Sequence, residues 1–169
     1  SPLFKYSLTG IDAKALLERI LLRDVGHCEV GKAHYTCWCD DRGFVLQDGV
    51  VMQGNSGEFW LTAAEPTLRY FRGVAKEMGL SEVIIEDVSS DFGILSLQGP
   101  QAYNVISELT GVSGTLSYFD VVQTEIVGCS VTVSRTGYTG DLGYEIWIRS
   151  DDAMRVWDAL IGAGEDYNI

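Results

Sequence analysis

Apolar and polar residues alternate along several short runs of this 169-residue chain, and helix-like spacings separate some of those runs. A period of two predicts half-buried β-strands, whereas apolar residues three and four positions apart predict a helix with one buried face. In the first half, this pattern predicts the order βαβββαβ, at 4–9, 12–22, 33–39, 44–52, 59–63, 65–78 and 83–88. Asp12 is the expected N-cap of the first helix, and Pro66 is expected in the first turn of the second.

The second half repeats the start of the first. The segments that begin at Ser7 and Ser96 share Ser, Leu, Gly and Ala at matching positions. Strands are expected at 118–127, 129–135 and 144–149, before a last helix capped by Ser150. The apolar face expected for that helix comprises Ala153, Met154, Val156, Trp157, Leu160 and Ile161. These patterns predict an α+β fold of two similar lobes, 1–90 and 91–169, each an antiparallel sheet with helices packed on one side. A cleft between two such lobes would be a preferred ligand site.

A glycine-rich segment, 134–146, lies between two of the strands in the second half. Gly137, Gly140 and Gly143 predict a tight bend that exposes polar side chains. The side chains expected on it are Tyr138, Thr139, Asp141 and Glu145. A strand rather than a helix follows the bend, so the segment does not predict a phosphate-binding loop. Residue types alone leave two interpretations open, a plain hairpin or a ligand site.

Composition narrows the possible partners. The chain has 24 acidic and 12 basic residues and a formal net charge of −12, which argues against a nucleic-acid partner or an anionic membrane surface. No apolar run approaches the ~18 residues of a membrane span, and the N-terminal residues lack a signal-peptide pattern. We therefore expect a cytoplasmic protein without a membrane or nucleic-acid partner. The missing initiator Met suggests a piece of a longer chain.

Cysteine and histidine residues are few. Four cysteines in a chain with this many apolar residues do not predict a disulfide framework, so Cys28, Cys37, Cys39 and Cys129 are expected to be free thiols. On a strand, Cys37 and Cys39 would place both sulfurs on one face and Trp38 on the other. Their spacing is not that of a zinc site, so no metal site is predicted. His27 and His34 are expected to be structural.

Two carboxylates are candidates for chemistry. Asp48 interrupts an otherwise apolar strand, where a carboxylate must reach water, find a partner or be held for use. Its alternative is an edge-strand aspartate beside Gly49 at a bulge. Glu145 offers a planar acceptor for two parallel N–H donors, and its alternative is a salt-bridged strand glutamate.

The run Arg135-Thr-Gly-Tyr-Thr-Gly-Asp-Leu-Gly-Tyr-Glu-Ile146, with Leu97-Gln-Gly-Pro100, closely resembles the glycine cleavage system T-protein family of folate-dependent one-carbon transferases. The resemblance continues through 31–36, 40–43 and the Asp48 strand. It implies that tetrahydrofolate lies in the cleft, with its pterin held by Glu145. Tyr35 and Tyr138 would line the folate site, and Asp48 would be the catalytic acid. It further implies that the chain is incomplete, because family members carry flanking segments and a C-terminal barrel.

The resemblance implies aminomethyl transfer to folate from an aminomethyl-carrying protein. Two departures keep other activities open. Many family members have two adjacent acids where this chain has Gln47-Asp48, and an asparagine where it has only Thr62. Demethylating relatives tend to keep a single acid, so one alternative is a tetrahydrofolate-dependent O- or S-demethylase with a small methylated donor. The others are a non-catalytic folate-binding module and a purely structural lobe.

Overall fold

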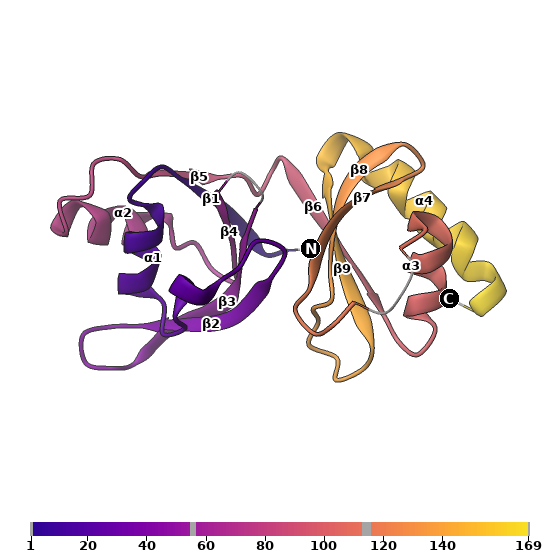
Figure 1. Cartoon of the computed structure of the whole chain (residues 1–169), viewed down its shortest axis with the longest axis horizontal. Coiled ribbons are helices and arrows are strands. Elements are labelled where there is room, and N and C mark those ends of the chain that lie inside the picture. Colours follow the sequence, from indigo (N-terminus) through magenta and orange to yellow (C-terminus); the bar gives the residue numbers. More distant parts are fainter. Residues whose placement is uncertain (1, 55–56, 113–115, 169) are drawn as a thin grey trace. The chain divides into compact units, whose positions relative to one another are not determined.

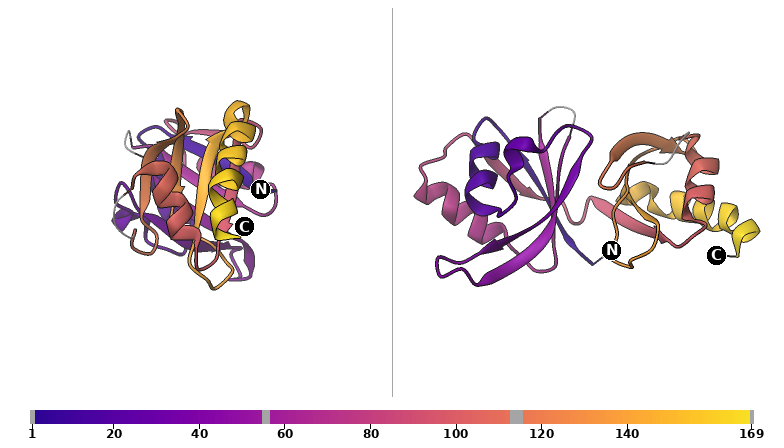
Figure 2. Two further views of the ribbon diagram at one scale, coloured as in Figure 1. Left: turned by 90° about the vertical axis from the view of Figure 1, so that its right-hand side faces the viewer. Right: turned by 60° about the horizontal axis from the view of Figure 1, so that its bottom comes forward.

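The computed structural model describes residues 2–54, 57–112 and 116–168. Its contacts divide the chain between Ser89 and Ser90 into two compact units, which we call the N-terminal and the C-terminal unit. Each unit is an antiparallel sheet with helices on one face (Figures 1 and 2). This arrangement confirms the predicted α+β fold class. In the described part of the chain, no helix combines the length and the apolar character that a membrane crossing needs.

The N-terminal unit has a five-stranded sheet in the order β2-β3-β4-β1-β5. Its elements follow the predicted order, with one additional 3-10 helix, η1. Their bounds are β1 Phe4–Thr9, α1 Ala13–Ile20, η1 Val25–His27, β2 Ala33–Cys39, β3 Val45–Gln53, β4 Phe59–Ala63, α2 Leu68–Glu77 and β5 Ile84–Asp87.

The core of this unit lies between the sheet and the pair α1 and α2. Trp38 and Phe71 are both buried and meet edge to face, with ring centroids 5.6 Å apart. Val51 of β3 is also fully buried. Because side chains alternate across a strand, Cys37, next to the buried Trp38, points to the face without helices, and Asp48 lies directly opposite Cys37 on the same face. As expected, Trp38 and the two flanking cysteines lie on opposite faces of β2.

Asp12 occupies the N-cap position of α1, as predicted, but the predicted start of the second helix is wrong. The side chain of Asp12 makes no cap hydrogen bond, and α1 begins at Ala13. Its carboxylate instead accepts the backbone N–H of Glu82 at 2.8 Å, so a tertiary partner has replaced the cap. The second helix begins at Leu68 rather than near Pro66. The buried Thr67 stays outside the helix and donates its backbone N–H to the hydroxyl of Tyr6 at 3.0 Å.

The C-terminal unit has a four-stranded sheet in the order β6-β9-β8-β7, with α3 and α4 together on one face (Figure 1). Val105, Ile146 and Val156 are fully buried between the sheet and these helices. The bounds are β6 Phe92–Gln98, α3 Ala102–Thr110, β7 Val121–Ile126, β8 Cys129–Ser134, β9 Gly143–Arg149, η2 Ser150–Asp152, α4 Ala153–Gly164 and η3 Glu165–Tyr167.

Three details of this unit correct the sequence prediction. Strand β7 starts at Val121, three residues late, because the chain turns before it and Phe119 has a φ of 64°. Ser150 belongs to η2 and donates its hydroxyl to the carbonyl of Ser90 at 2.6 Å instead of capping α4. Helix α4 buries a narrower stripe than expected, because only Val156 and Leu160 of the six expected apolar residues are buried. The exposed members of its apolar set are Met154, Trp157 and Ile161.

Candidate functional site

Tyr35 and Asp48 are in direct contact on the helix-free face of the N-terminal sheet. Tyr35 lies opposite Val50 and Cys37 lies opposite Asp48, so the tyrosine and the aspartate are diagonal neighbours on β2 and β3. The Tyr35 hydroxyl donates to Oδ2 of Asp48 at 2.6 Å. Both side chains are exposed. Two of the residues predicted for the site are therefore joined by a hydrogen bond.

This contact also sets the protonation of the tyrosine. The hydrogen bond to Asp48, together with the negative charge of that carboxylate, raises the pKa of Tyr35 above its ordinary value of 10.0. The phenol therefore stays protonated at neutral pH and remains a donor. Asp48 in turn presents its other oxygen to solvent-facing space on the sheet.

Strand β3 lies between β2 and β4 in the sheet, but the interpretation of Asp48 as an edge residue near a bulge agrees with the pairing at its own position. A bulge does occur nearby, at Leu46, since Trp38 pairs with Gln47 whereas Cys39 pairs with Val45. The pairing of β3 with β4 covers only its second half, from Val51 onward among the described residues. Asp48 thus lies where β3 runs beyond β4 as a two-stranded ribbon with β2.

Gly49 allows β3 and β4 to approach closely at this point. A Cβ built on Gly49 would overlap the backbone carbonyl of Thr62 in β4. Beside it, the backbone N–H of Val50 donates to the Thr62 hydroxyl at 3.0 Å. Glycine is therefore required for close approach of β4 rather than for a turn. The close contact fixes the backbone next to Asp48.

The glycine-rich segment of the C-terminal unit joins β8 to β9, as predicted, but its glycines have different tasks. Of Gly137, Gly140 and Gly143, only Gly140 has a left-handed backbone, with a φ of 76°. The predicted bend is present between the strands, but Gly140 alone contributes a left-handed residue to it. A Cβ on Gly137 or Gly143 would instead overlap the side chain of Gln98.

Gln98 holds this loop in place. Its Nε2 donates to the carbonyl oxygens of Tyr144 at 3.2 Å and Thr136 at 3.4 Å. Its Oε1 accepts the hydroxyl of Thr139 at 3.2 Å. The family resemblance in the sequence includes Leu97-Gln-Gly-Pro100, but it did not predict that Gln98 contacts the glycine-rich loop. The available signal was a polar residue at the end of an apolar strand, which faces Gly143 in the register of β6 and β9.

Glu145 lies on β9, on the face opposite to the buried Ile146, and is half-buried. Its carboxylate accepts the hydroxyl of Thr136, which in turn contacts the hydroxyl of Ser134 at 2.7 Å. No cation among the residues that the structure describes pairs with it, so the salt-bridge interpretation is wrong. Tyr138 lies on the same loop and is 91% exposed.

The predicted site residues thus form two groups, one in each unit. Tyr35 and Asp48 lie on the helix-free face of the first sheet, and Glu145 lies on the corresponding face of the second, beside the loop that carries Tyr138. Each group presents a carboxylate hydrogen-bonded to a hydroxyl. A common cleft for both groups stays a prediction.

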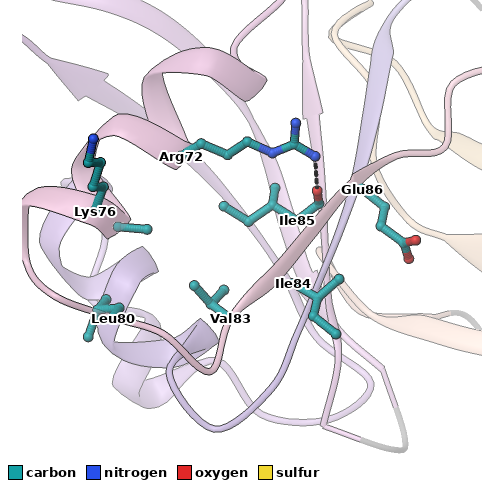
Figure 3. Close-up of a pocket in the computed structure, with 8 residues that line it drawn as sticks. Arg72, Lys76, Leu80, Val83, Ile84, Ile85 and Glu86 are labelled. Atoms are coloured by element: carbon teal, nitrogen blue, oxygen red, sulfur yellow. Dashed lines mark hydrogen bonds between the residues drawn. The ribbon is translucent and has the colours of Figure 1, made fainter.

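The structure also contains hollows that the sequence did not predict. A groove of about 560 Å³ lies between α2 and β5, where Arg72 reaches from the helix and donates to the carbonyl of Ile85 at 2.9 Å (Figure 3). Leu80 and Val83 line its opposite side (Figure 3). No predicted site residue lines this groove. A smaller cavity of about 180 Å³ lies against the glycine-rich loop, next to Thr136.

Comparison with known proteins agrees with the resemblance seen in the motifs. The family model described as the GCVT N-terminal domain matches residues 1–169. The chain is 32% identical over 164 residues to an aminomethyltransferase of Bacillus subtilis, an alignment that covers 96% of this chain. It covers 45% of that relative, so the chain spans about half the length of such curated relatives.

Two solved structures share the fold. The aminomethyltransferase T of the glycine cleavage system from Bartonella henselae superposes with a TM-score of 0.80 at 24% identity, covering 96% of this chain and 44% of that one. The heterotetrameric sarcosine oxidase of Corynebacterium sp. U-96 gives 0.72 at 20% identity, covering 100% and 83%. Identities this low speak for the fold alone.

Proposed function

The chain belongs to the family of the GCVT N-terminal domain, and we propose that it takes part in tetrahydrofolate-dependent one-carbon transfer of the aminomethyltransferase type. The observation that carries this proposal is the similarity to aminomethyltransferases along nearly the whole chain. The reaction would use small-molecule folate as acceptor and an aminomethyl-carrying protein as donor. A cytoplasmic location stays part of this proposal.

Asp48 is the proposed catalytic carboxylate. Positive charge develops on a carbon that leaves an amine for a folate nitrogen, and a fixed negative group stabilises that charge or accepts the proton of the nitrogen. The hydrogen bond from Tyr35 holds one oxygen of Asp48 and leaves the other available. Tyr35 would thereby orient the acid as well as border the folate.

Glu145 is the proposed anchor of the pterin ring. The exocyclic amino group and the adjacent ring N–H of a pterin form two parallel donors, which match the two oxygens of a carboxylate. Glu145 fits this task, because its described partner is one hydroxyl and an ionised carboxylate has about four acceptor positions. The exposed ring of Tyr138, on the adjoining loop, would cover the bound ring.

The missing second acid does not decide between aminomethyl and methyl donors. Gln47 pairs with Trp38, whose side chain is buried on the helix side of the sheet. Directly opposed residues in an antiparallel pair share a face, so position 47 points away from Asp48. An acid at position 47 would therefore add no carboxylate beside Asp48. Demethylation stays the second candidate, because the family that the chain resembles includes demethylating relatives.

A ligand-induced rise in thermal stability tests folate binding. At a tetrahydrofolate concentration of 100 Kd, binding at one site adds about 2.7 kcal/mol to the free energy of unfolding. The measurement compares this chain with the full natural protein, because the chain spans about half the length of its curated relatives. No rise in either would refute a folate site and leave a structural lobe.

Asp48→Asn then separates catalysis from binding. We expect the substitution to lower aminomethyl transfer far more than the affinity for folate, because Asp48 acts on the carbon in transit. Folate binding without transfer in the unmodified full protein would show a binding module instead. Equal losses of transfer and affinity in the variant would refute the catalytic role.

A further inference from the structure

Two hydroxyls connect the interior of the C-terminal unit to Glu145. Ser134 is 2% exposed and Thr136 is 6% exposed, and their oxygens are 2.7 Å apart. The Thr136 hydroxyl also contacts Oε2 of Glu145. Buried hydroxyls without partners are costly, so both positions must serve this network.

The number of protons fixes the direction of the chain. An ionised carboxylate only accepts, so the single hydroxyl proton of Thr136 goes to Glu145. Ser134 must then donate to Thr136 at 2.7 Å, because no other proton lies between their oxygens, and its contact of 3.4 Å with the backbone carbonyl of Glu145 is the weaker of the two. The network therefore runs one way, from Ser134 through Thr136 to Glu145.

Thr136 is itself held at its backbone. Its carbonyl accepts Nε2 of Gln98 at 3.4 Å, and Gln98 is braced at the same time by Tyr144 and Thr139. The hydroxyl that reaches Glu145 therefore sits on a fixed point of the loop rather than on a free side chain. A carboxylate bonded to such a donor loses rotational freedom before any ligand arrives.

We propose that Thr136 is a positioning residue, which orients the Glu145 carboxylate so that it selects ligands with paired N–H donors. This proposal rests on the proposed function of Glu145 as the anchor of the pterin. Thr136 occupies one acceptor position of Oε2, and the carboxylate plane then presents its remaining positions in one orientation. An unfixed carboxylate would still attract a cation or a single donor, but it would lose discrimination for the paired arrangement.

The experiment measures affinity for tetrahydrofolate and for its analogue without the 2-amino group, in the full natural protein. The unmodified protein should bind the analogue about 10-fold or more weakly, since one charge-assisted hydrogen bond is lost. Thr136→Val keeps the shape of the side chain and removes the hydroxyl. We expect it to bind tetrahydrofolate about 10-fold more weakly and to distinguish the two ligands by less than about threefold.

Two control variants isolate the hydroxyl. Thr136→Ser restores the donor and should recover the discrimination of the unmodified protein. Thr110→Val removes a hydroxyl of α3 that bonds the carbonyl of Ile106 and has no part in this network, and it should leave discrimination unchanged. Full discrimination in a folded Thr136→Val protein would overturn the proposal.

The outcomes separate this proposal from the proposed function. If the unmodified protein does not bind tetrahydrofolate, the proposed function fails. If it binds and discriminates, but Thr136→Val discriminates equally well, only the role of Thr136 fails. If Thr136→Val does not fold, Ser134→Ala tests the same network by removing the hydroxyl that donates to Thr136. There we expect reduced discrimination, and an unchanged ratio of the two affinities would overturn the proposal.

Discussion

Gly49→Ala tests whether close approach of β4 positions the strand that carries Asp48. The new methyl group would overlap the carbonyl of Thr62, which is backbone and cannot rotate away. Relief requires β3 and β4 to separate at this point. That movement would also stretch the bond from the Val50 N–H to the Thr62 hydroxyl, now 3.0 Å.

The expected cost has two parts. Inserting a methyl group into a closely packed contact costs about 1–3 kcal/mol. Weakening the hydrogen bond at the largely buried Thr62 adds about 1 kcal/mol. A total of about 2–4 kcal/mol corresponds to a fall in Tm of at least about 8 °C for a unit of this size. Thermal unfolding followed by the fluorescence of the buried Trp38 measures this fall in the N-terminal unit.

Gly73→Ala is the matched control, because it makes the same chemical change at an open position. Gly73 lies inside α2, and a Cβ there meets nothing within 4 Å. Alanine should stabilise the helix by about 0.5–1 kcal/mol and raise Tm. If Gly49→Ala were as stable as Gly73→Ala, the Thr62 carbonyl would not be what requires glycine at position 49.

Three further predictions test other contacts. Gly143→Ala should cost about 1–3 kcal/mol in urea unfolding. The same substitution should cost much less in a Gln98→Ala background, and equal costs in the two backgrounds would exclude the overlap between them. Asp48→Asn should lower the pKa of Tyr35, since removing the carboxylate charge favours the phenolate. The NMR signals of the tyrosine ring, followed through a pH titration, measure this pKa, and an unchanged pKa in the variant would contradict the prediction. Burial lowers the pKa of His34 below its ordinary value of 6.5, so the unfolded chain binds the proton more readily and stability falls as the pH drops through that value. The His34→Gln variant should therefore lose less stability than the unmodified chain between about pH 7.5 and about pH 5.5. Equal losses would refute the attribution of this pH dependence to His34.

Strand positions could be predicted from the sequence, because apolar residues recur at every second position in a strand that buries one face. The runs at 4–9, 33–39 and 59–63 have the bounds that the structure shows. The hydrogen bonds of the expected cap residues could not be predicted in the same way. Asp12 and Ser150 are suitable N-caps by residue type, yet each bonds a backbone group at least 60 residues away in sequence. The helix and capping propensities of the neighbouring residues do not predict such distant partners.

The same limit applies to the candidate site. Asp48 was notable in the sequence because a carboxylate interrupts an apolar strand, and Glu145 because it follows the glycine-rich loop. The partners that hold Glu145 and its loop depend on strand register. Gln98 faces Gly143 only because β6 pairs with β9, and Ser134 faces Glu145 only because β8 pairs with β9. Neither register can be read from the local pattern around each residue.

The glycines near both carboxylates also favour the correct strand register. A slip of one residue would turn Asp48 or Glu145 to the helix side of its sheet, where a charge would be buried among apolar side chains. Gly49 and Gly143 each accept a close neighbour, the backbone carbonyl of Thr62 in one unit and the end of the Gln98 side chain in the other, and a Cβ would displace it. A slipped strand would place a side chain at that contact and create an overlap. The two glycines therefore penalise the wrong register directly, beyond the burial of apolar residues, at the positions where the direction of a carboxylate matters.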